Sequence, residues 1–235
     1  DNLIPVIIEN YRDFLFHHPS VHKKYMTYLL LVILVSIATW GLFRYLIKQS
    51  KNPKGWIGRQ MMRLWNRIYL PMVDWSLAPL MDKTPQNILD VGVGNGKSTQ
   101  HLHEAFPQSN IYGIDISATA IAEAQKLNAP SISFSVRNIE ETGFSPQQFD
   151  LICAYQTHFH GQNPTQAFSE LHRILSDCGT LIIACETAKL NYYLPLWKDT
   201  KTLTAYLRSL GWTLSDFRRN RTFTAFYLTK SAIEA

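Results

Sequence analysis

A glycine-rich turn and a carboxylate downstream of it are the residues whose types and spacing most clearly indicate chemistry. Glycine recurs at every second position in a turn that contains Gly92, Gly94, Asn95 and Gly96. Glycine lets a backbone turn tightly and approach a ligand where a Cβ would clash. Asp115 lies about twenty residues further on, where a carboxylate can accept hydrogen bonds from both hydroxyls of a ribose. The pattern predicts a nucleoside-binding turn.

The spacing of these glycines differs from that of two common phosphate-binding loops. Lys97 occupies the position of the third glycine in the dinucleotide pattern G-x-G-x-x-G. A Walker loop, G-x-x-x-x-G-K-[ST], would need its first glycine one residue before Gly92. Neither a dinucleotide nor a nucleotide phosphate is therefore the expected ligand.

Three further side chains could move a proton. His158 and His160 follow a predicted strand, and imidazole titrates near neutrality, so either could act as a base. A His-x-His pair can also begin a metal site, or both can be ordinary loop residues. Glu186, at the end of the next predicted strand, is another candidate base or a capping carboxylate. We assign these three residues to catalysis and none to a metal.

The elements that must position these residues alternate between short apolar runs and helical stretches. Strands are predicted at 87–93, 110–116, 131–138, 149–156 and 179–186, with helices at 98–106, 118–128, 164–175 and 198–210. This alternation indicates a parallel sheet buried on both faces. Ligands of such sheets bind at the carboxyl ends of the strands, near the point where strand order reverses.

The C-terminal end departs from this alternation. The last two predicted strands, 213–219 and 222–230, are separated only by Asn220 and Arg221. Strands joined so tightly must be antiparallel. The expected fold class is therefore α/β, a doubly wound, mostly parallel, seven-stranded sheet with a C-terminal antiparallel hairpin, preceded by a transmembrane helix.

Four segments in this order resemble the motifs of class I S-adenosylmethionine-dependent methyltransferases: Ile88–Gly96, Gly113–Ser117, Phe149–Ile152, and Leu171–Leu175 before Gly179. The resemblance covers residues 70–230 and includes the terminal hairpin, and it implies a Rossmann-like fold. The chain departs from the family at Val93, where a smaller residue is usual, and at Asp177-Cys178, where a proline is usual. Neither change removes a group that the chemistry needs.

The resemblance implies S-adenosylmethionine as the cofactor and assigns roles around its methionine part. The glycine turn, including Asn95, would pass beneath the methionine, and Asp90 would hold the turn and the amino group. Tyr155 and Gln156, at the end of a strand, would face the methyl sulfonium. The alternative for Asp90 is a turn-capping residue.

The resemblance assigns the nucleoside to the ends of the second and third strands. Asp115 would bind the ribose, and Asn138 would bond the amino group of the adenine. Ile116 and Ile139 would pack on the two faces of the adenine, unless they are ordinary core residues.

The charge distribution indicates a membrane rather than a nucleic acid as the partner. The net charge of +5 divides into +7 over residues 1–73 and −2 over residues 74–235. A DNA-binding protein would carry its positive charge on the folded domain. Here the positive charge flanks an apolar run, as it does beside a membrane surface. Three cysteines without a close pair suit a reducing compartment.

The apolar run is long enough to cross a bilayer. Tyr25–Phe43 contains nineteen residues without a charge, bounded by Lys23, Lys24 and Arg44. At ~1.5 Å per residue such a helix spans about 28 Å, close to the hydrocarbon thickness. We predict an interfacial segment over 1–24, a transmembrane helix over 25–43, a basic linker with an amphipathic helix over 44–73, and the methyltransferase domain over 74–235. A buried helix or a secretory signal is the alternative.

Basic residues beyond this run predict its orientation. Seven Lys or Arg and no acid lie between Arg44 and Arg67, so positive-inside bias places the domain in the cytoplasm of a single-pass protein. Arg59, Arg63 and Arg67 form a stripe on the amphipathic helix. The stripe either meets lipid phosphates or is merely solvated.

The anchor biases the expected methyl acceptor toward a lipidic or amphiphilic small molecule. The same fold acting on a membrane protein or a soluble metabolite is the first alternative. A non-catalytic module that only binds S-adenosylmethionine is the second, although the intact glycine turn and Asp115 argue against it.

Overall fold

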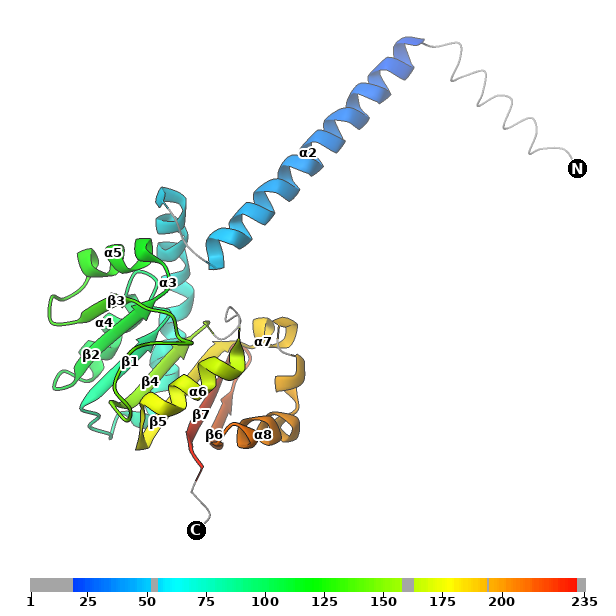
Figure 1. The fold of residues 1–235 in the computed structure, drawn as a ribbon. Helices are drawn as coiled ribbons and strands as arrows, with labels where there is room; N and C mark the ends of the chain where they lie inside the picture. Colours follow the sequence, from blue (N-terminus) through cyan, green and yellow to red (C-terminus); the bar gives the residue numbers. More distant parts are fainter. Residues whose placement is uncertain (1–18, 52–54, 158–162, 194, 232–235) are drawn as a thin grey trace, which may run out of the picture. The chain divides into compact units, whose positions relative to one another are not determined.

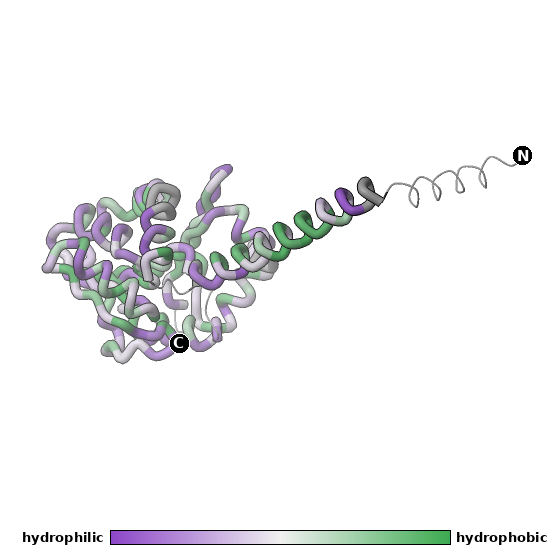
Figure 2. The backbone as a smooth tube through the Cα atoms, turned by 90° about the horizontal axis from the view of Figure 1, so that it is seen from above, coloured by the Kyte–Doolittle hydropathy of each residue, from purple (hydrophilic) through white to green (hydrophobic). Residues whose placement is uncertain are grey.

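A computed structural model describes residues 19–51, 55–157, 163–193 and 195–231. The chain divides into two compact units, residues 1–48 and 49–235, each of which is described by itself. The first unit consists of most of α2 (Pro19–Lys51), a helix of 33 residues. Its segment Lys23–Gln49 has a mean hydropathy of 2.1, and none of its most apolar stretch is buried. Figure 2 shows the continuous hydrophobic run along this helix.

The second unit is built on one seven-stranded sheet in the order β3-β2-β1-β4-β5-β7-β6 (Figure 1). Only β7 runs antiparallel to its neighbours, so the predicted mostly parallel, seven-stranded sheet with a C-terminal antiparallel hairpin is confirmed. Strand order reverses between β1 and β4, which pair in parallel. The strands are β1 (Asn87–Val91), β2 (Asn110–Asp115), β3 (Ser133–Val136), β4 (Phe149–Tyr155), β5 (Leu175–Glu186), β6 (Trp212–Arg219) and β7 (Phe223–Lys230).

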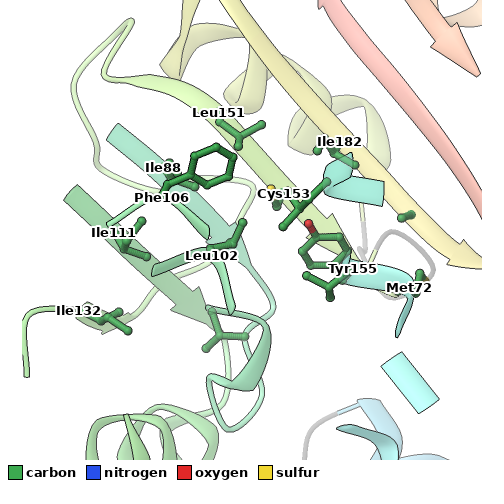
Figure 3. Packing of buried hydrophobic residues seen from close by; sticks show 14 of the residues in the cluster. Met72, Ile88, Leu102, Phe106, Ile111, Ile132, Leu151, Cys153, Tyr155 and Ile182 are labelled. Carbon is green, nitrogen blue, oxygen red and sulfur yellow. The ribbon is translucent and has the colours of Figure 1, made fainter. Parts of the chain in front are cut away.

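Helices cover both faces of the sheet because the strands are apolar on both sides. On one face, α3 (Gly55–Leu77), α4 (Lys97–Ala105) and α5 (Ala118–Leu127) enclose the core cluster that Figure 3 shows. On the other face, α6 (Pro164–Ile174), α7 (Thr187–Tyr193) and α8 (Thr200–Ser209) enclose a second cluster. Two short 3₁₀ helices, Ala78–Leu80 and Pro195–Lys198, lie in the connections.

Two elements differ from the sequence expectation. Strand β5 begins at Leu175 rather than at Gly179, because Leu175 pairs with Phe149 before a register shift lets Thr180 pair with Leu151. The extra residues of β5 between these two pairs form a bulge. Helix α7 is seven residues long and was not predicted, since so short a segment carries too few turns for a periodic pattern.

The C-terminal end of α3 is fixed to the sheet by hydrogen bonds to its last carbonyls. These carbonyls have no partner within their own helix. The carbonyl of Trp75 accepts from Arg218 of β6 at 3.0 Å, and that of Ser76 accepts from the Tyr227 hydroxyl of β7 at 2.7 Å. Met72 and Val73 of the same helix are fully buried. Helix α3 therefore belongs to the folded domain, although Pro71 removes one hydrogen bond within it.

We expect Tyr227→Phe to lower the free energy of unfolding by about 1–2 kcal/mol, because it leaves the buried carbonyl of Ser76 without a donor. Urea unfolding followed by tryptophan fluorescence measures the change. Ser209→Ala, which removes a hydroxyl from an exposed hydrogen bond on α8, is the control and should change stability far less. Equal stability of Tyr227→Phe and the parent chain would contradict the docking of α3 described here.

Candidate functional site

The glycine turn between β1 and α4 has left-handed backbone at all three glycines. The φ angles are 74° at Gly92, 57° at Gly94 and 78° at Gly96, a region that residues with a Cβ rarely adopt. Space is short as well: a Cβ on Gly92 would lie 2.0 Å from Cγ2 of Thr157, and one on Gly96 2.8 Å from Cζ of Phe134. Neighbouring protein atoms therefore require glycine at Gly92 and Gly96, in addition to any ligand. Asn95, within the turn, is buried.

Asp90 lies beneath this turn and is 1% exposed. Its Oδ2 accepts hydrogen bonds from the hydroxyls of Ser98 and Thr99, both at 2.7 Å. Its Oδ1 is buried and has no hydrogen-bond partner among the described residues. Burial raises the pKa of Asp90 to about 6, against the opposing effect of the two hydroxyls. The sequence did not single out Ser98 and Thr99, although hydroxyl residues directly after a glycine turn were a usable signal.

Asp115 at the end of β2 is joined to the same turn. Its Oδ2 accepts from the N–H of Gly94 at 3.0 Å, and its Oδ1 accepts from the N–H of Ser117 at 2.8 Å. Burial raises the pKa of this carboxyl, and the backbone N–H groups oppose that shift. The glycines and the carboxylate that the sequence singled out therefore lie together at the carboxyl edge of the sheet.

Apolar side chains are exposed at the ends of the next strands. Ile116 after β2 is 60% exposed, and Val136 at the end of β3 is 52% exposed. Asn138 is exposed and its Oδ1 accepts from the N–H of Glu140, whereas Ile139 is half-buried against the core beneath α6. Val136 was not predicted as a site residue, because a valine that ends a strand reads as core.

Residues at the end of β4 separate into two environments. Tyr155 is buried in the cluster beneath α3, with Met72 and Ile182 (Figure 3). Gln156 is 8% exposed and has a left-handed φ of 61°. Thr157 lies against Gly92, as the short distance to a Cβ there indicates. His158 and His160 lie outside the described residues.

Glu186 at the end of β5 is paired with a cation. Its Oε2 lies 2.7 Å from Nζ of Lys189, which also donates to the hydroxyl of Tyr69 at 2.9 Å. These contacts join β5, α7 and α3 beside the carboxyl edge of the sheet. Within the part of the chain that the structure describes, no cluster of three or more His, Cys, Asp or Glu could hold a metal ion.

Two arginines of the predicted stripe on α3 meet an acid of the domain itself. Nε of Arg59 lies 4.0 Å, and an Nη of Arg63 3.5 Å, from carboxylate oxygens of Glu123 on α5. Both guanidinium groups keep substantial solvent exposure, so such pairs contribute little to stability. Arg59 and Arg63 therefore pair with Glu123 and also remain accessible to solvent.

Known proteins share the sequence of the part of the chain that forms this edge of the sheet. Residues 89–183 match the family described as a methyltransferase domain. A trans-aconitate 2-methyltransferase of Acidovorax sp. (strain JS42) is 35% identical over 107 residues, which are 46% of this chain and 41% of that protein. A probable chloroplastic tocopherol O-methyltransferase of Oryza sativa subsp. japonica is 32% identical over 128 residues, which are 50% of this chain and 35% of that protein. The chain thus spans less than half the length of these curated relatives.

A solved structure shows the same fold. A putative S-adenosyl-L-methionine-dependent methyltransferase of Methanococcus maripaludis superposes with a TM-score of 0.59 at 18% identity, covering 76% of this chain and 94% of that one. The residues present also fit the family's cofactor, because Asp90 offers an unpaired buried oxygen to an ammonium group and exposed Ile116 offers an apolar surface to adenine. Residues 89–183 therefore form a methyltransferase domain with the fold of the S-adenosylmethionine-dependent enzymes, and S-adenosylmethionine is the cofactor that the comparisons support.

Proposed function

We propose that the protein is a membrane-anchored methyltransferase that methylates a lipidic or amphiphilic small molecule. The proposal depends on the glycine turn, where the N–H of Gly94 holds Asp115 and where Asp90 keeps a buried oxygen without a partner. The same chain has a long, exposed apolar helix. When bound, the cofactor supplies an electrophilic methyl group on a sulfonium. The remaining task of the protein is to align an acceptor and exclude water.

The roles of the chain follow from its geometry. Asp115 would accept hydrogen bonds from the ribose hydroxyls, on lone pairs beyond those that Gly94 and Ser117 occupy. The free oxygen of Asp90 would receive the amino group, so that the buried carboxylate gains the charge partner it lacks. Ile116 and Ile139 remain the proposed contacts of the adenine, and Asn138 the partner of its amino group.

A base is needed only if the acceptor holds a proton that it cannot lose unaided. We retain His158 and His160 as candidates, and also Glu186. Glu186 would have to exchange its 2.7 Å ion pair with Lys189 for the acceptor proton. During such an exchange Lys189 would keep the Tyr69 hydroxyl as its second partner.

The anchor supports an acceptor that resides in the bilayer. An apolar core helix of a soluble domain would be buried, whereas the most apolar stretch of α2 is exposed throughout. Lys23 and Lys24 precede this stretch and Arg44 follows it, and the excess of basic residues beyond Arg44 supports a cytoplasmic position of the domain. Among the named relatives, the tocopherol O-methyltransferase acts on an amphiphilic molecule, and the trans-aconitate enzyme favours a soluble metabolite as the alternative.

The proposal is tested by methyl labelling. Membranes from cells that produce the full chain are incubated with methyl-labelled S-adenosylmethionine and partitioned into organic, aqueous and protein fractions. We expect label in the organic fraction, and its loss with Asp115→Ala, which removes the ribose acceptor. Label confined to protein or to the aqueous fraction would contradict the lipidic acceptor, and absence of transferred label would contradict the enzyme activity.

A charged residue in the middle of the proposed membrane span should weaken its insertion. Leu34→Arg places a guanidinium near the middle of the apolar run, which costs about 2.5–3.5 kcal/mol. We expect a smaller fraction of the variant to resist alkaline carbonate extraction, with the full-length mass retained in both fractions. Leu34→Ala is the control and should remain in the membrane. Extraction of the parent chain by carbonate, or its recovery without the N-terminal segment, would contradict a stable anchor.

We expect Asp90→Asn to raise the stability of the protein and to lower its affinity for the cofactor. Burial raises the folded-state pKa of Asp90 to about 6, above its unfolded value near 3.9. As the pH falls, the native state therefore binds this proton near pH 6 and the unfolded state only near pH 4. Ionised Asp90 thus lowers the free energy of unfolding, and this loss is complete above pH 6. Asp90→Asn should raise the thermal midpoint of the cofactor-free chain at pH 8 more than at pH 5.

The same substitution should weaken binding of S-adenosylhomocysteine about tenfold or more, because the amino group loses an anionic partner. Calorimetry at pH 8 on the detergent-solubilised chain measures the affinity. Asp82→Asn, at an exposed carboxylate, is the matched control for both measurements. An unchanged dissociation constant for Asp90→Asn would remove Asp90 from the cofactor site.

A further inference from the structure

Gln156 combines two unfavourable features in one residue. Its backbone has a left-handed φ of 61°, a conformation that residues with a side chain rarely adopt. Its side chain is 8% exposed, and both Nε2 and Oε1 are buried without a hydrogen-bond partner among the described residues. Its backbone N–H donates to the carbonyl of Ala184 at 2.9 Å.

A buried amide without a partner destabilises a folded protein, and so does a strained backbone. Packing does not require the unpaired amide, since leucine would fill a similar volume without a polar atom. Residues that keep such costs cluster at binding and catalytic sites, where a ligand supplies the missing partner. Gln156 therefore has the properties of a group that waits for a ligand.

The position of Gln156 limits what that ligand can be. The residue follows β4, which pairs with β1 at the point where strand order reverses. The next residue, Thr157, lies against Gly92 of the cofactor turn. Asp115, Asn138 and Asp90 are the proposed partners of the ribose, the adenine amino group and the methionine amino group. The methionine carboxylate can only accept, so it would leave the carbonyl of the Gln156 amide unpaired. The ligand of Gln156 is then the molecule that meets the methyl group from the other side.

We propose that the carboxamide of Gln156 binds the acceptor, and that the acceptor presents a hydroxyl. A carboxamide offers an N–H donor and a carbonyl acceptor side by side. A hydroxyl satisfies both at once, whereas a quaternary ammonium satisfies neither, and an ionised phosphate or carboxylate leaves the carbonyl unpaired. This inference rests on the proposed methyl transfer and specifies the substrate class of that same site.

Gln156→Leu on the full chain tests the inference with three readouts. Transfer of label from methyl-labelled S-adenosylmethionine to a total lipid extract should fall at least tenfold, mainly through a higher lipid concentration for half-maximal rate. The dissociation constant of S-adenosylhomocysteine should stay within twofold. The thermal midpoint without cofactor should stay equal or rise, because an unpaired amide has been removed.

Gln100→Leu is the matched control. Gln100 is half-buried, and its amide donates to Glu104 at 3.0 Å and accepts from the N–H of Ala129 at 3.3 Å. Its loss should lower the thermal midpoint and leave the lipid dependence of label transfer unchanged. Gln156→Glu, which keeps the shape but introduces a charge, should transfer label no better than Gln156→Leu.

Three results would overturn the inference. A lower thermal midpoint in Gln156→Leu would show that the amide is paired within the protein or by a resident water. Weaker binding of S-adenosylhomocysteine would make Gln156 a cofactor contact. Label transfer equal to that of the parent chain would leave Gln156 without a role in acceptor binding. A parent chain that binds S-adenosylhomocysteine but labels nothing contradicts the proposed function itself, and the inference falls with it.

Discussion

The carboxyl edge of the sheet depends on the left-handed backbone of three glycines between β1 and α4. Because Gly92, Gly94 and Gly96 all adopt positive φ, the chain reverses within a few residues and can satisfy two carboxylates at once. On one side the N–H of Gly94 donates a hydrogen bond to Asp115. On the other side the hydroxyls of Ser98 and Thr99, at the start of α4, donate to Asp90. A single backbone conformation thus holds both acids of the proposed cofactor site.

Several polar groups at this edge remain incompletely paired within the protein. Asp90 keeps one buried oxygen free, and Gln156 keeps both amide atoms free. Buried atoms without a partner also occur away from this edge, as Nε1 of Trp212 does, whereas the carbonyl of Ser76 is paired with Tyr227. At the edge the unpaired groups belong to a carboxylate and a carboxamide, which gain partners when the proposed ligands bind.

Helix α3 is attached to the domain at both of its ends. Its C-terminal turn is held by β6 and β7 through Arg218 and Tyr227, and Tyr69 contacts Lys189 beside Glu186. Towards its start, Arg59 and Arg63 meet Glu123 of α5, the helix that follows Asp115. One helix therefore contacts elements that carry both the nucleoside and the proposed acceptor residues.

The sequence was sufficient to predict the doubly wound, mostly parallel sheet, the terminal hairpin and the glycine turn with Asp115, because each depends on local spacing. It could not predict the pairing of Arg59 and Arg63 with Glu123, which depends on how α3 packs against α5. The unpaired amide of Gln156 was equally out of reach, since pairing is a property of the surroundings rather than of residue type. Helix α7 and the bulge that extends β5 to Leu175 were missed because neither has a periodic pattern.

The most direct test of the central claim is a crystal structure of the full chain with S-adenosylhomocysteine. The account predicts the nucleoside over the glycine turn, with both ribose hydroxyls on the carboxylate of Asp115 and the amino group at the free oxygen of Asp90. A turn that stays empty at saturating ligand, or that holds the nucleoside away from these two carboxylates, would contradict it.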